Sequence, residues 1–374
     1  MSAPAKPKNI GILTAGGDCP GLNAAIRGVA KAARDTHGMT VVGFLDGFTG
    51  LVENRFMPIS DEISTGLLTL GGTILGTSRN KPHKMPLPDG STRDMTGAAL
   101  ETYRRLHLDC LVCIGGGGTA KNALRLQEAG LNIVTLPKTI DNDVAETDVT
   151  FGYDSSMSIA TEAIDRLHTT ASSHKRLMLV DIMGHNTGWL ALAASIAAGS
   201  DVCLIPEIPY SFDSVMGALE RRLERGRRFS LISIAEGARP APPRTSRDEK
   251  GGRSSKKKNG QRSANGKPAD NSVSQANLLG PKLEKALGIE TRVTTLGHVQ
   301  RGGIPTPTDR LLATALGITA AQLIADGKYG VMVGVKGVEM VPVPLEKVAG
   351  KKKTVPLDHP MIRTARAIGL CLGD

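Results

Sequence analysis

The stretch NIVTLPKTIDND, residues 132–143, predicts a buried strand that ends in an acidic turn. Its first part, residues 132–136, is typical of a buried strand, and Pro137 has no N–H with which to extend that strand. Asp141 and Asp143 therefore follow a strand end, and in an open α/β sheet ligands bind beyond the carboxyl ends of the strands. One carboxylate could accept a proton while the other holds a cation. An Asx turn that only caps the strand explains the same residues.

Three glycine-rich turns each follow a predicted strand. They are AGGDCPG (15–21), before a helix over residues 24–33, GGTILGTSRN (71–80), and GGGGT (115–119), which leaves the apolar run 109–114. Glycine backbone at a helix N-terminus suits a bound anion. Four consecutive glycines cost backbone entropy and have no expected packing use, so we expect a ligand against them. Together with the acidic turn, they predict a site for a polyphosphate and a divalent cation.

The second half of the chain has the pattern of another α/β unit. It predicts a helix over residues 155–170, strands over 176–182, 201–205 and 229–235, and a helix over 189–198. The run TRVTTLGHVQRGG (291–303) predicts a further strand that ends in a glycine turn. Arg292, His298 and Arg301 would supply donors for an anionic, hydroxyl-rich ligand.

Length and charge narrow the class of protein further. A chain of 374 residues exceeds what one hydrophobic core normally supports, so two lobes are expected. The net charge is +10, but ten basic and three acidic residues between positions 239 and 272 account for +7 of it. This region, residues 238–275, is predicted to be a disordered basic insertion. Because aromatic residues make up only 3%, nucleic-acid binding is not expected.

The cysteines and the apolar segments point to the cytoplasm. The five cysteines form no metal-ligand set, and Cys110 and Cys113 lie in an apolar strand, so we expect reduced, buried thiols. No signal peptide is recognised before Asn9, and the longest apolar stretch, residues 189–199, is too short to span a bilayer. We therefore expect no membrane contact.

The motifs, taken in order, resemble the bacterial 6-phosphofructokinase family. They are GILTAGGDCPGLNAAIRG, GTSR, PKTIDND, HKR, the Met-Gly turn and TRVTTLGHVQRGG, and they span residues 10 to about 315. The resemblance implies two Rossmann-like αβα lobes with the active site between them. It implies a donor lobe of residues 1–152 plus about 303–350, and a fructose 6-phosphate lobe of 153–302 plus about 351–374. It also implies phosphoryl transfer to the sugar 1-hydroxyl with Mg²⁺, in glycolysis.

The resemblance assigns a role to each matching residue. Asp141 would be the general base and Asp143 the magnesium-associated carboxylate, with Lys138, Thr139 and His185 beside the reacting groups. The donor site would contain Gly16, Gly17, Arg79, Asn80, Gly116, Gly117, Gly118 and Thr119. The fructose 6-phosphate site would contain Thr139, Asp141, Arg176, Met183, Gly184, His185, Glu236, Arg292, His298 and Arg301. Arg176 and Arg292 would reach in from a neighbouring subunit, which implies a homo-oligomer, dimer or tetramer, with shared active sites.

Three positions depart from the family pattern. Gly117 stands where the family usually has Asp, His185 where it usually has Arg, and Lys138 where many ATP enzymes have Gly. A carboxylate near the metal is thus missing and a lysine is added.

The donor predicted from these positions is ATP. Pyrophosphate enzymes of the family typically combine an Asp at the position of Gly118 with a Lys at that of Lys138. Glycine at 118 leaves room for a nucleotide, whereas a lysine at 138 excludes neither donor. Because the available space should determine the choice of donor, ATP is expected and pyrophosphate is the alternative. Two other classes fit part of the pattern: a lipid or NAD kinase, which has a similar glycine loop, and a weakened kinase that binds polyanions.

Overall fold

The computed structural model describes residues 8–242 and 274–374, and these residues form two compact units. Unit 1 contains the residues up to Ile159 together with His298–Thr354, and unit 2 contains Ala160–Gly297 and Val355–Asp374. Both are α/β units, as the sequence predicts. Among the described residues, no helix combines the length and apolar character needed to cross a membrane.

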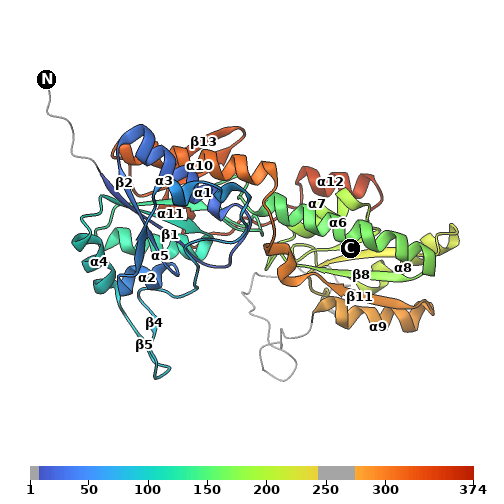
Figure 1. The fold of residues 1–374 in the computed structure, drawn as a ribbon. Helices are drawn as coiled ribbons and strands as arrows, with labels where there is room; N and C mark the ends of the chain where they lie inside the picture. Colours follow the sequence, from blue (N-terminus) through green and yellow to red (C-terminus); the bar gives the residue numbers. More distant parts are fainter. Residues whose placement is uncertain (1–7, 243–273) are drawn as a thin grey trace. The chain divides into compact units, whose positions relative to one another are not determined.

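Unit 1 is built on a sheet of seven strands in the order β13-β12-β7-β6-β1-β2-β3. The strands are β1 (Asn9–Thr14), β2 (Thr40–Phe44), β3 (Phe56–Pro58), β6 (Cys110–Gly115), β7 (Ile133–Pro137), β12 (Val331–Lys336) and β13 (Glu339–Pro344). The five inner strands are parallel, and the edge strands β3 and β13 are antiparallel to their neighbours. A short hairpin, β4 (Met85–Pro86) and β5 (Thr92–Arg93), extends from this unit (Figure 1).

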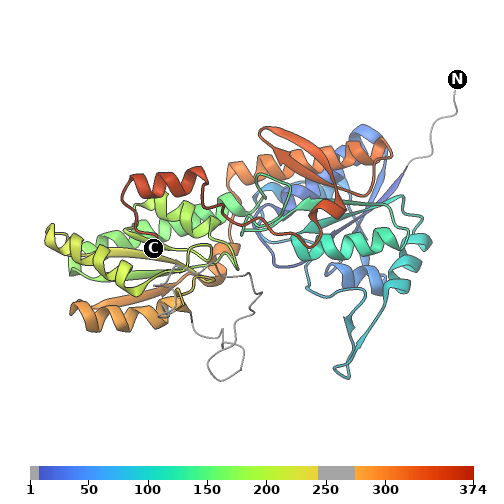
Figure 2. The same cartoon turned by 180° about the vertical axis from the view of Figure 1, so that it is seen from behind.

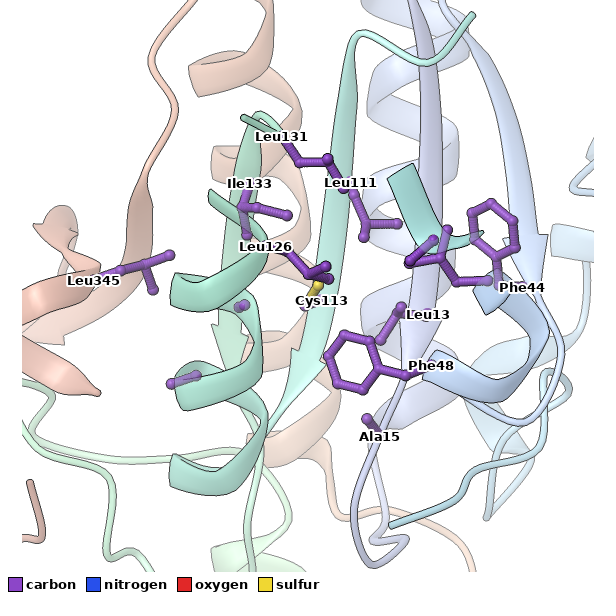
Figure 3. Packing of buried hydrophobic residues seen from close by; sticks show 14 of the residues in the cluster. Leu13, Ala15, Phe44, Phe48, Leu111, Cys113, Leu126, Leu131, Ile133 and Leu345 are labelled. Atoms are coloured by element: carbon purple, nitrogen blue, oxygen red, sulfur yellow. The ribbon is translucent and has the colours of Figure 1, made fainter. Parts of the chain in front are cut away.

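Helices cover both faces of the unit 1 sheet (Figure 1). One face carries α2 (Phe48–Glu53), α4 (Thr96–Arg105), α5 (Gly117–Glu128) and α11 (Leu345–Val348), whose apolar residues join the strands in one buried cluster (Figure 3). Phe44, Phe48 and Leu111 are fully or almost fully buried in it. The other face carries α1 (Leu22–Lys31) and α10 (Pro307–Ala325).

Two glycines let α1 and α10 approach each other closely. A Cβ at Gly28 would lie 2.8 Å from the Thr314 carbonyl oxygen, and one at Gly317 would lie 2.7 Å from the Val29 nitrogen. Glycine is therefore required where these helices cross. The remaining short helices are a π-helix η1 (Ala32–Thr36), α3 (Asp61–Ser64), and the 3₁₀ helices η2 (Leu67–Thr69) and η3 (Gly297–Arg301).

Unit 2 has a parallel four-stranded sheet in the order β11-β8-β10-β9. Its strands are β8 (Leu177–Ile182), β9 (Val202–Leu204), β10 (Ser230–Ala235) and β11 (Thr291–Thr295). Its helices are α6 (Tyr153–His174), α7 (Trp189–Ala198), α8 (Phe212–Glu224), α9 (Gln275–Leu287) and α12 (Pro360–Ala367). Helices α8 and α9 share one buried apolar cluster, and α12 lies on the opposite face of the sheet from α9 (Figure 2).

The division between the units differs from the boundaries given by the resemblance. It falls inside α6, after Ile159, rather than before Tyr153, because one continuous helix carries the chain from one unit to the other. Unit 1 also keeps residues 351–354. Their backbone pairs with the acidic turn: Val144 and Lys352 form an antiparallel bridge, and the Lys353 N–H donates to the Asp143 carbonyl at 2.9 Å.

The predicted insertion, residues 238–275, lies mostly outside the described residues. Its two ends are ordered, which corrects the predicted limits. The Tyr210 N–H donates to the Arg239 carbonyl at 3.0 Å, and the Ala241 N–H donates to the Tyr210 carbonyl at 2.7 Å. At the other end, Ser274 caps α9 by accepting a hydrogen bond from the Asn277 N–H. Local hydrogen bonds therefore order residues whose composition alone predicts disorder.

Candidate active site

The three glycine-rich turns meet at the carboxyl edge of the unit 1 sheet. Strands β1 and β6 are parallel neighbours, and beyond them the Ala15 N–H donates to the Ile114 carbonyl at 3.0 Å. The second turn joins the first, because the Gly16 N–H donates to the Ser78 carbonyl at 2.9 Å and the Thr77 hydroxyl donates to the Gly16 carbonyl at 2.7 Å. Turns that are about 60 and 100 residues apart in sequence thus form one surface, as expected for parallel strands.

Thr119 explains the first glycine of the third turn. A Cβ at Gly115 would lie 2.1 Å from Thr119 Oγ1, and the same hydroxyl donates to the Ala15 carbonyl at 3.3 Å. The expectation that none of the four glycines has a packing role is therefore wrong for Gly115. Its missing side chain lets Thr119 tie the first and third turns together.

The next glycines leave open space at the start of α5. Gly116 precedes the helix, and Gly117 and Gly118 are its first two residues. A Cβ at Gly117 would meet only the Lys351 carbonyl, at 4.0 Å, and one at Gly118 would meet no described residue within 4 Å. Because the first N–H groups of a helix have no partner within it, this open N-terminus can bind an anion.

Lys138 contacts the first glycine turn through its buried side chain. It follows β7 directly, its side chain is almost fully buried, and its ammonium group donates to the Gly17 carbonyl. Burial lowers the pKa of Lys138, with the nearby Arg301 charge acting in the same direction. A lysine held in this way has a strong electrostatic preference for an anion beside it.

The side chain of Arg301, the last residue of η3, contacts the same turn. A Cβ at Gly17 would be 1.8 Å from Arg301 Nη1, so the guanidinium occupies the space that any other residue would need. Arg301 Nε is buried and has no hydrogen-bond partner among the described residues. The resemblance assigns Gly17 to the donor site and Arg301 to the sugar-phosphate site. The structure brings both together, next to Lys138.

The second glycine turn contributes Arg79 and Asn80. The Asn80 amide donates to Thr49 Oγ1 at 3.1 Å, while the Ser78 hydroxyl donates to the Asp46 carbonyl at 2.7 Å. These bonds fix the backbone on both sides of Arg79. The Arg79 side chain is exposed, so its guanidinium is accessible to a ligand.

The acidic turn follows β7, whose strand ends at Pro137, one residue later than predicted. The Asp141 N–H donates to Thr139 Oγ1 at 3.1 Å. Asn142 is buried and has a left-handed φ of 50°, a conformation that asparagine tolerates better than most residues. Asp141 and Asp143 on either side of it are only partly buried. The inward turn of Asn142 thus leaves one carboxylate residue on each side.

The acidic turn suits magnesium only together with a phosphate. Within residues 8–242 and 274–374, no group of three or more His, Cys, Asp or Glu side chains could hold a metal ion. Mg²⁺ is usually bound by one or two carboxylates, with waters and substrate phosphates completing its shell. Asp143, with Asp141 two residues away, fits that pattern. Gly117 adds no third carboxylate.

Unit 2 presents a second cluster at the carboxyl ends of β8 and β10. Met183, Gly184 and His185 follow β8, and Glu236 follows β10. The His185 N–H donates to Glu236 Oε1 at 2.5 Å, which holds the two turns together. His185 has a left-handed φ of 53° and is exposed. Four of the six predicted sugar-site residues of this unit therefore lie close together.

The structure divides the predicted triplet Arg292, His298 and Arg301. Strand β11 confirms the predicted strand at the start of this region, but it ends at Thr295 and η3 follows, so the strand does not continue to the glycine turn as predicted. His298 and Arg301 belong to unit 1, whereas Arg292 lies near the amino end of β11 in unit 2.

Arg292 forms an ion pair with a neighbouring carboxylate, that of Glu290. Glu290 forms ion pairs with both Arg176 and Arg292, and the two arginines hold its pKa below the ordinary value. In parallel strands β8 and β11 these residues lie at the amino end, whereas Met183 lies past the carboxyl end. Six residues of strand separate the two ends, roughly 20 Å. Arg176 and Arg292 thus form a cluster separate from Met183 and Glu236 of the same chain.

Fold and site together define an α/β protein with a site suited to phosphorylated ligands. The glycine-lined edge of unit 1, the neighbouring cations Lys138 and Arg301 and the acidic turn support this conclusion. The family model described as phosphofructokinase matches residues 9–324, and this chain belongs to that family.

Relatives with similar sequences match over almost their whole length. The chain is 52% identical over 370 residues to a protein of Propionibacterium freudenreichii subsp. shermanii named ATP-dependent 6-phosphofructokinase, covering 98% of this chain and 99% of the relative. It is 50% identical over 380 residues to a Spirochaeta thermophila protein of the same name, covering all of both chains.

Solved structures of phosphofructokinases have the same fold. The T-state phosphofructokinase of Pichia pastoris matches with a TM-score of 0.76 and 29% identity, over 97% of this chain and 36% of that one. A pyrophosphate-dependent phosphofructokinase of Nitrosospira multiformis matches with a TM-score of 0.79 over 99% of this chain and 93% of that one. At 18% identity, the latter supports the fold alone.

Lys353 is a residue near the acidic turn that sequence reasoning missed. It belongs to the run Lys351–Lys353, which in sequence looks like any solvated basic segment. Its ammonium group donates hydrogen bonds at 2.8 Å to Asn142 Oδ1, 2.9 Å to the Thr147 carbonyl and 2.8 Å to the Asp148 carbonyl. No pattern in the sequence distinguishes it from its two neighbours.

Proposed function

We propose that this protein transfers the terminal phosphoryl group of ATP to the 1-hydroxyl of fructose 6-phosphate, giving fructose 1,6-bisphosphate. The observation that carries this proposal is the position of Asp141. It lies on the turn after β7, and the residue three positions before it, Lys138, contacts the first glycine turn. A proton acceptor and a phosphate cradle thus lie in one unit.

Asp141 acts as the general base that takes the proton of the sugar 1-hydroxyl. General base catalysis typically contributes about 10² to 10⁴ in rate. Thr139 accepts a hydrogen bond from the Asp141 N–H and so fixes the start of the turn. Lys138 and Arg301 place positive charge beside the first glycine turn, where the charge on the transferring group must be stabilised. The proposed donor site is completed by Gly16, Gly17, Arg79, Asn80, Gly116, Gly117, Gly118 and Thr119.

Asp143 would hold Mg²⁺ together with the donor phosphates, and the ion would neutralise phosphate charge. Because Gly117 supplies no carboxylate, the buried ammonium of Lys138 takes over part of that neutralisation.

Each unit by itself contains proposed sugar-phosphate contacts. In unit 2 they are Met183, Gly184, His185 and Glu236, and in unit 1 they are His298 and Arg301. Arg176 and Arg292 serve the site of a neighbouring subunit. Their distance from Met183 along β8 supports this assignment, since they cannot join the Met183 cluster of their own chain. The protein is accordingly proposed to be a homo-oligomer with shared active sites.

ATP is the proposed donor. The relatives at 52% and 50% identity are named ATP-dependent, and a Cβ at Gly118 would meet no described residue within 4 Å, so the nucleotide has room. The test is the rate of fructose 1,6-bisphosphate formation with ATP and with pyrophosphate, each alone. Turnover with ATP and none with pyrophosphate is expected, and turnover with pyrophosphate alone would overturn this proposal.

We propose that the protein acts in the cytoplasm. Its substrates are glycolytic intermediates, and all five cysteines are free, as expected for a protein in a reducing compartment. Four of the five are buried, and burial raises the pKa of the Cys19 thiol to about 12, so these thiols take no part in the chemistry.

A further inference from the structure

One lysine side chain, that of Lys353, makes three hydrogen bonds to the acidic turn and the loop that follows it. The ammonium group of Lys353 contacts three oxygens of residues 142–148, at distances of 2.8 to 2.9 Å. An ammonium group has three protons, so each can be donated to one of these oxygens. Lys353 also contacts the turn through its own backbone, since its N–H donates to the Asp143 carbonyl at 2.9 Å.

The contact to Asn142 determines how the turn is shaped. Asn142 Oδ1 accepts hydrogen bonds from both the Lys353 ammonium and the Thr150 N–H, at 2.8 and 3.2 Å. These bonds hold the amide inside the protein, and the backbone of Asn142 adopts its left-handed conformation around them. The flanking residues Asp141 and Asp143 are partly buried on either side of it, and Oδ1 of Asp141 is itself buried.

The far end of the same loop is fixed independently of Lys353. The Asp148 N–H donates to the Val335 carbonyl at 2.9 Å, and the Val335 N–H donates to Thr147 Oγ1 at the same distance. Asp148 also accepts from the Gly337 N–H at 2.8 Å. The loop would therefore stay attached to β12 without Lys353. At the acidic end, the bond from the ammonium group to Asn142 Oδ1 adds to the bonds from the Thr150 N–H and the Lys353 N–H.

Burying the charged ammonium group of Lys353 costs desolvation free energy, which nearby negative charge can offset. Burial lowers the pKa of Lys353 to about 8. The charges of Asp148 and Asp143 act to raise this pKa, and the charge of Lys336 acts to lower it. A neutral donor could satisfy the same carbonyls at a smaller desolvation cost. The ammonium group, by contrast, also places a positive charge behind a turn that carries two carboxylates.

We propose that Lys353 is a positioning residue for phosphoryl transfer, which orients Asp141 and Asp143 through its bond to the Asn142 side chain. The inference rests on the proposed function, because it assigns the turn to catalysis. Lys353 itself touches no reacting atom in this account. It acts on the geometry of the acidic turn, and a misplacement of about 1 Å in a catalytic group can cost about 10² in rate.

The test compares Lys353→Met with Lys352→Met in the full-length protein. Both variants lose one lysine charge, but Lys352 is exposed and contributes only its backbone to the bridge with Val144. We expect Lys353→Met to lower kcat by about 10- to 100-fold, with the KM for ATP within threefold of wild type. We expect Lys352→Met to keep the wild-type kcat. Lys353→Arg, which retains the charge, should recover part of the loss.

A purely structural role would give a different result. If Lys353→Met lowered the Tm but kept kcat within twofold of wild type, the proposal would be overturned. Hydrogen exchange supplies a second readout: the amides of residues 139–150 should exchange faster in Lys353→Met, and those of β6 should not. Unchanged exchange in the turn, with a lowered kcat, would also contradict the mechanism.

A second variant covers the case in which Lys353→Met fails to fold. Asn142→Gly removes the accepting amide but tolerates the left-handed backbone, and a kcat within twofold of wild type would overturn the proposal. Asp141→Asn separates the inference from the proposed function. An inactive Asp141→Asn with a fully active Lys353→Met refutes the inference alone, whereas an active Asp141→Asn refutes the proposed function.

Discussion

A carboxylate introduced at Gly118 should weaken nucleotide binding without destabilising the fold. Gly118 is the second residue of α5, and a Cβ there meets no described residue within 4 Å. The substitution Gly118→Asp therefore fits the protein without displacing a neighbour. Negative charge in the first turn of a helix stabilises it by about 0.3–1 kcal/mol, so the Tm should stay the same or rise.

The same carboxylate should oppose the α-phosphate of ATP. At a separation of about 4 Å and an effective dielectric constant of about 20, two like charges repel by about 4 kcal/mol. Since about 1.4 kcal/mol corresponds to a factor of ten, the Kd for ATP should rise by about 10³. Isothermal titration calorimetry with a non-hydrolysable ATP analogue measures this change directly, and steady-state kinetics should show a matching rise in the KM for ATP.

Gly117→Asp is the matched control, one residue earlier in the same helical turn. It adds the same charge where only the Lys351 carbonyl lies nearby, at 4.0 Å. We expect it to retain ATP binding and to lower the Mg²⁺ concentration needed for half-maximal activity, since it restores a carboxylate near the metal. ATP affinity in Gly118→Asp within threefold of wild type would refute the placement of the nucleotide at the start of α5.

Three further substitutions test the cations of the site. Gly17→Ala should raise the KM for fructose 6-phosphate at least tenfold in steady-state assays, because its Cβ would lie 1.8 Å from Arg301 Nη1; an unchanged KM would contradict the contact. Lys138→Met should lower kcat/KM for ATP by about 10- to 100-fold, the loss of one charged hydrogen-bond partner, and full activity would exclude a role in donor binding. Lys353 has a folded-state pKa of about 8 against 10.5 unfolded, so its stability contribution is present above pH 10.5 and lost as the pH falls through 8. Between these values the unfolding free energy of wild type should rise relative to Lys353→Met by at most about 3 kcal/mol in urea titrations; no difference would mean that the ammonium is solvated.

The convergence of the three glycine turns could be predicted from sequence alone. Each turn follows an apolar run, and the carboxyl ends of parallel strands meet at one edge of a sheet. The structure confirms this through the bonds among Ala15, Gly16, Ser78 and Ile114. The α/β class was predictable for the same reason, because runs such as residues 109–114 and 176–182 alternate with helical periods.

The contacts made by individual side chains were not predictable. Gly115 looked like a ligand-contacting glycine, but its space is filled by Thr119, four residues later on the helix. The hydrophobic periodicity of the sequence does not show which side chain fills the space beside a glycine. Arg292, His298 and Arg301 lie within ten residues of one another, yet a strand end and a 3₁₀ helix assign them to different units. Sequence proximity was a poor guide because the chain crosses between units here.

Lys353 was missed for a related reason. Its partners at residues 142–148 lie more than 200 positions earlier in the chain. In sequence it is one of three adjacent lysines, and surface lysines are common. Burial distinguishes it from Lys351 and Lys352, and burial follows only from the fold.

The central claim is that Asp141 removes the proton of the sugar hydroxyl during phosphoryl transfer. The most direct test is the kcat of Asp141→Asn, an isosteric change that keeps hydrogen-bonding capacity but removes the base. Fructose 1,6-bisphosphate formation should fall by about 10² to 10⁴ at saturating ATP and fructose 6-phosphate, with the Tm unchanged. A kcat within a factor of three of wild type would contradict the account.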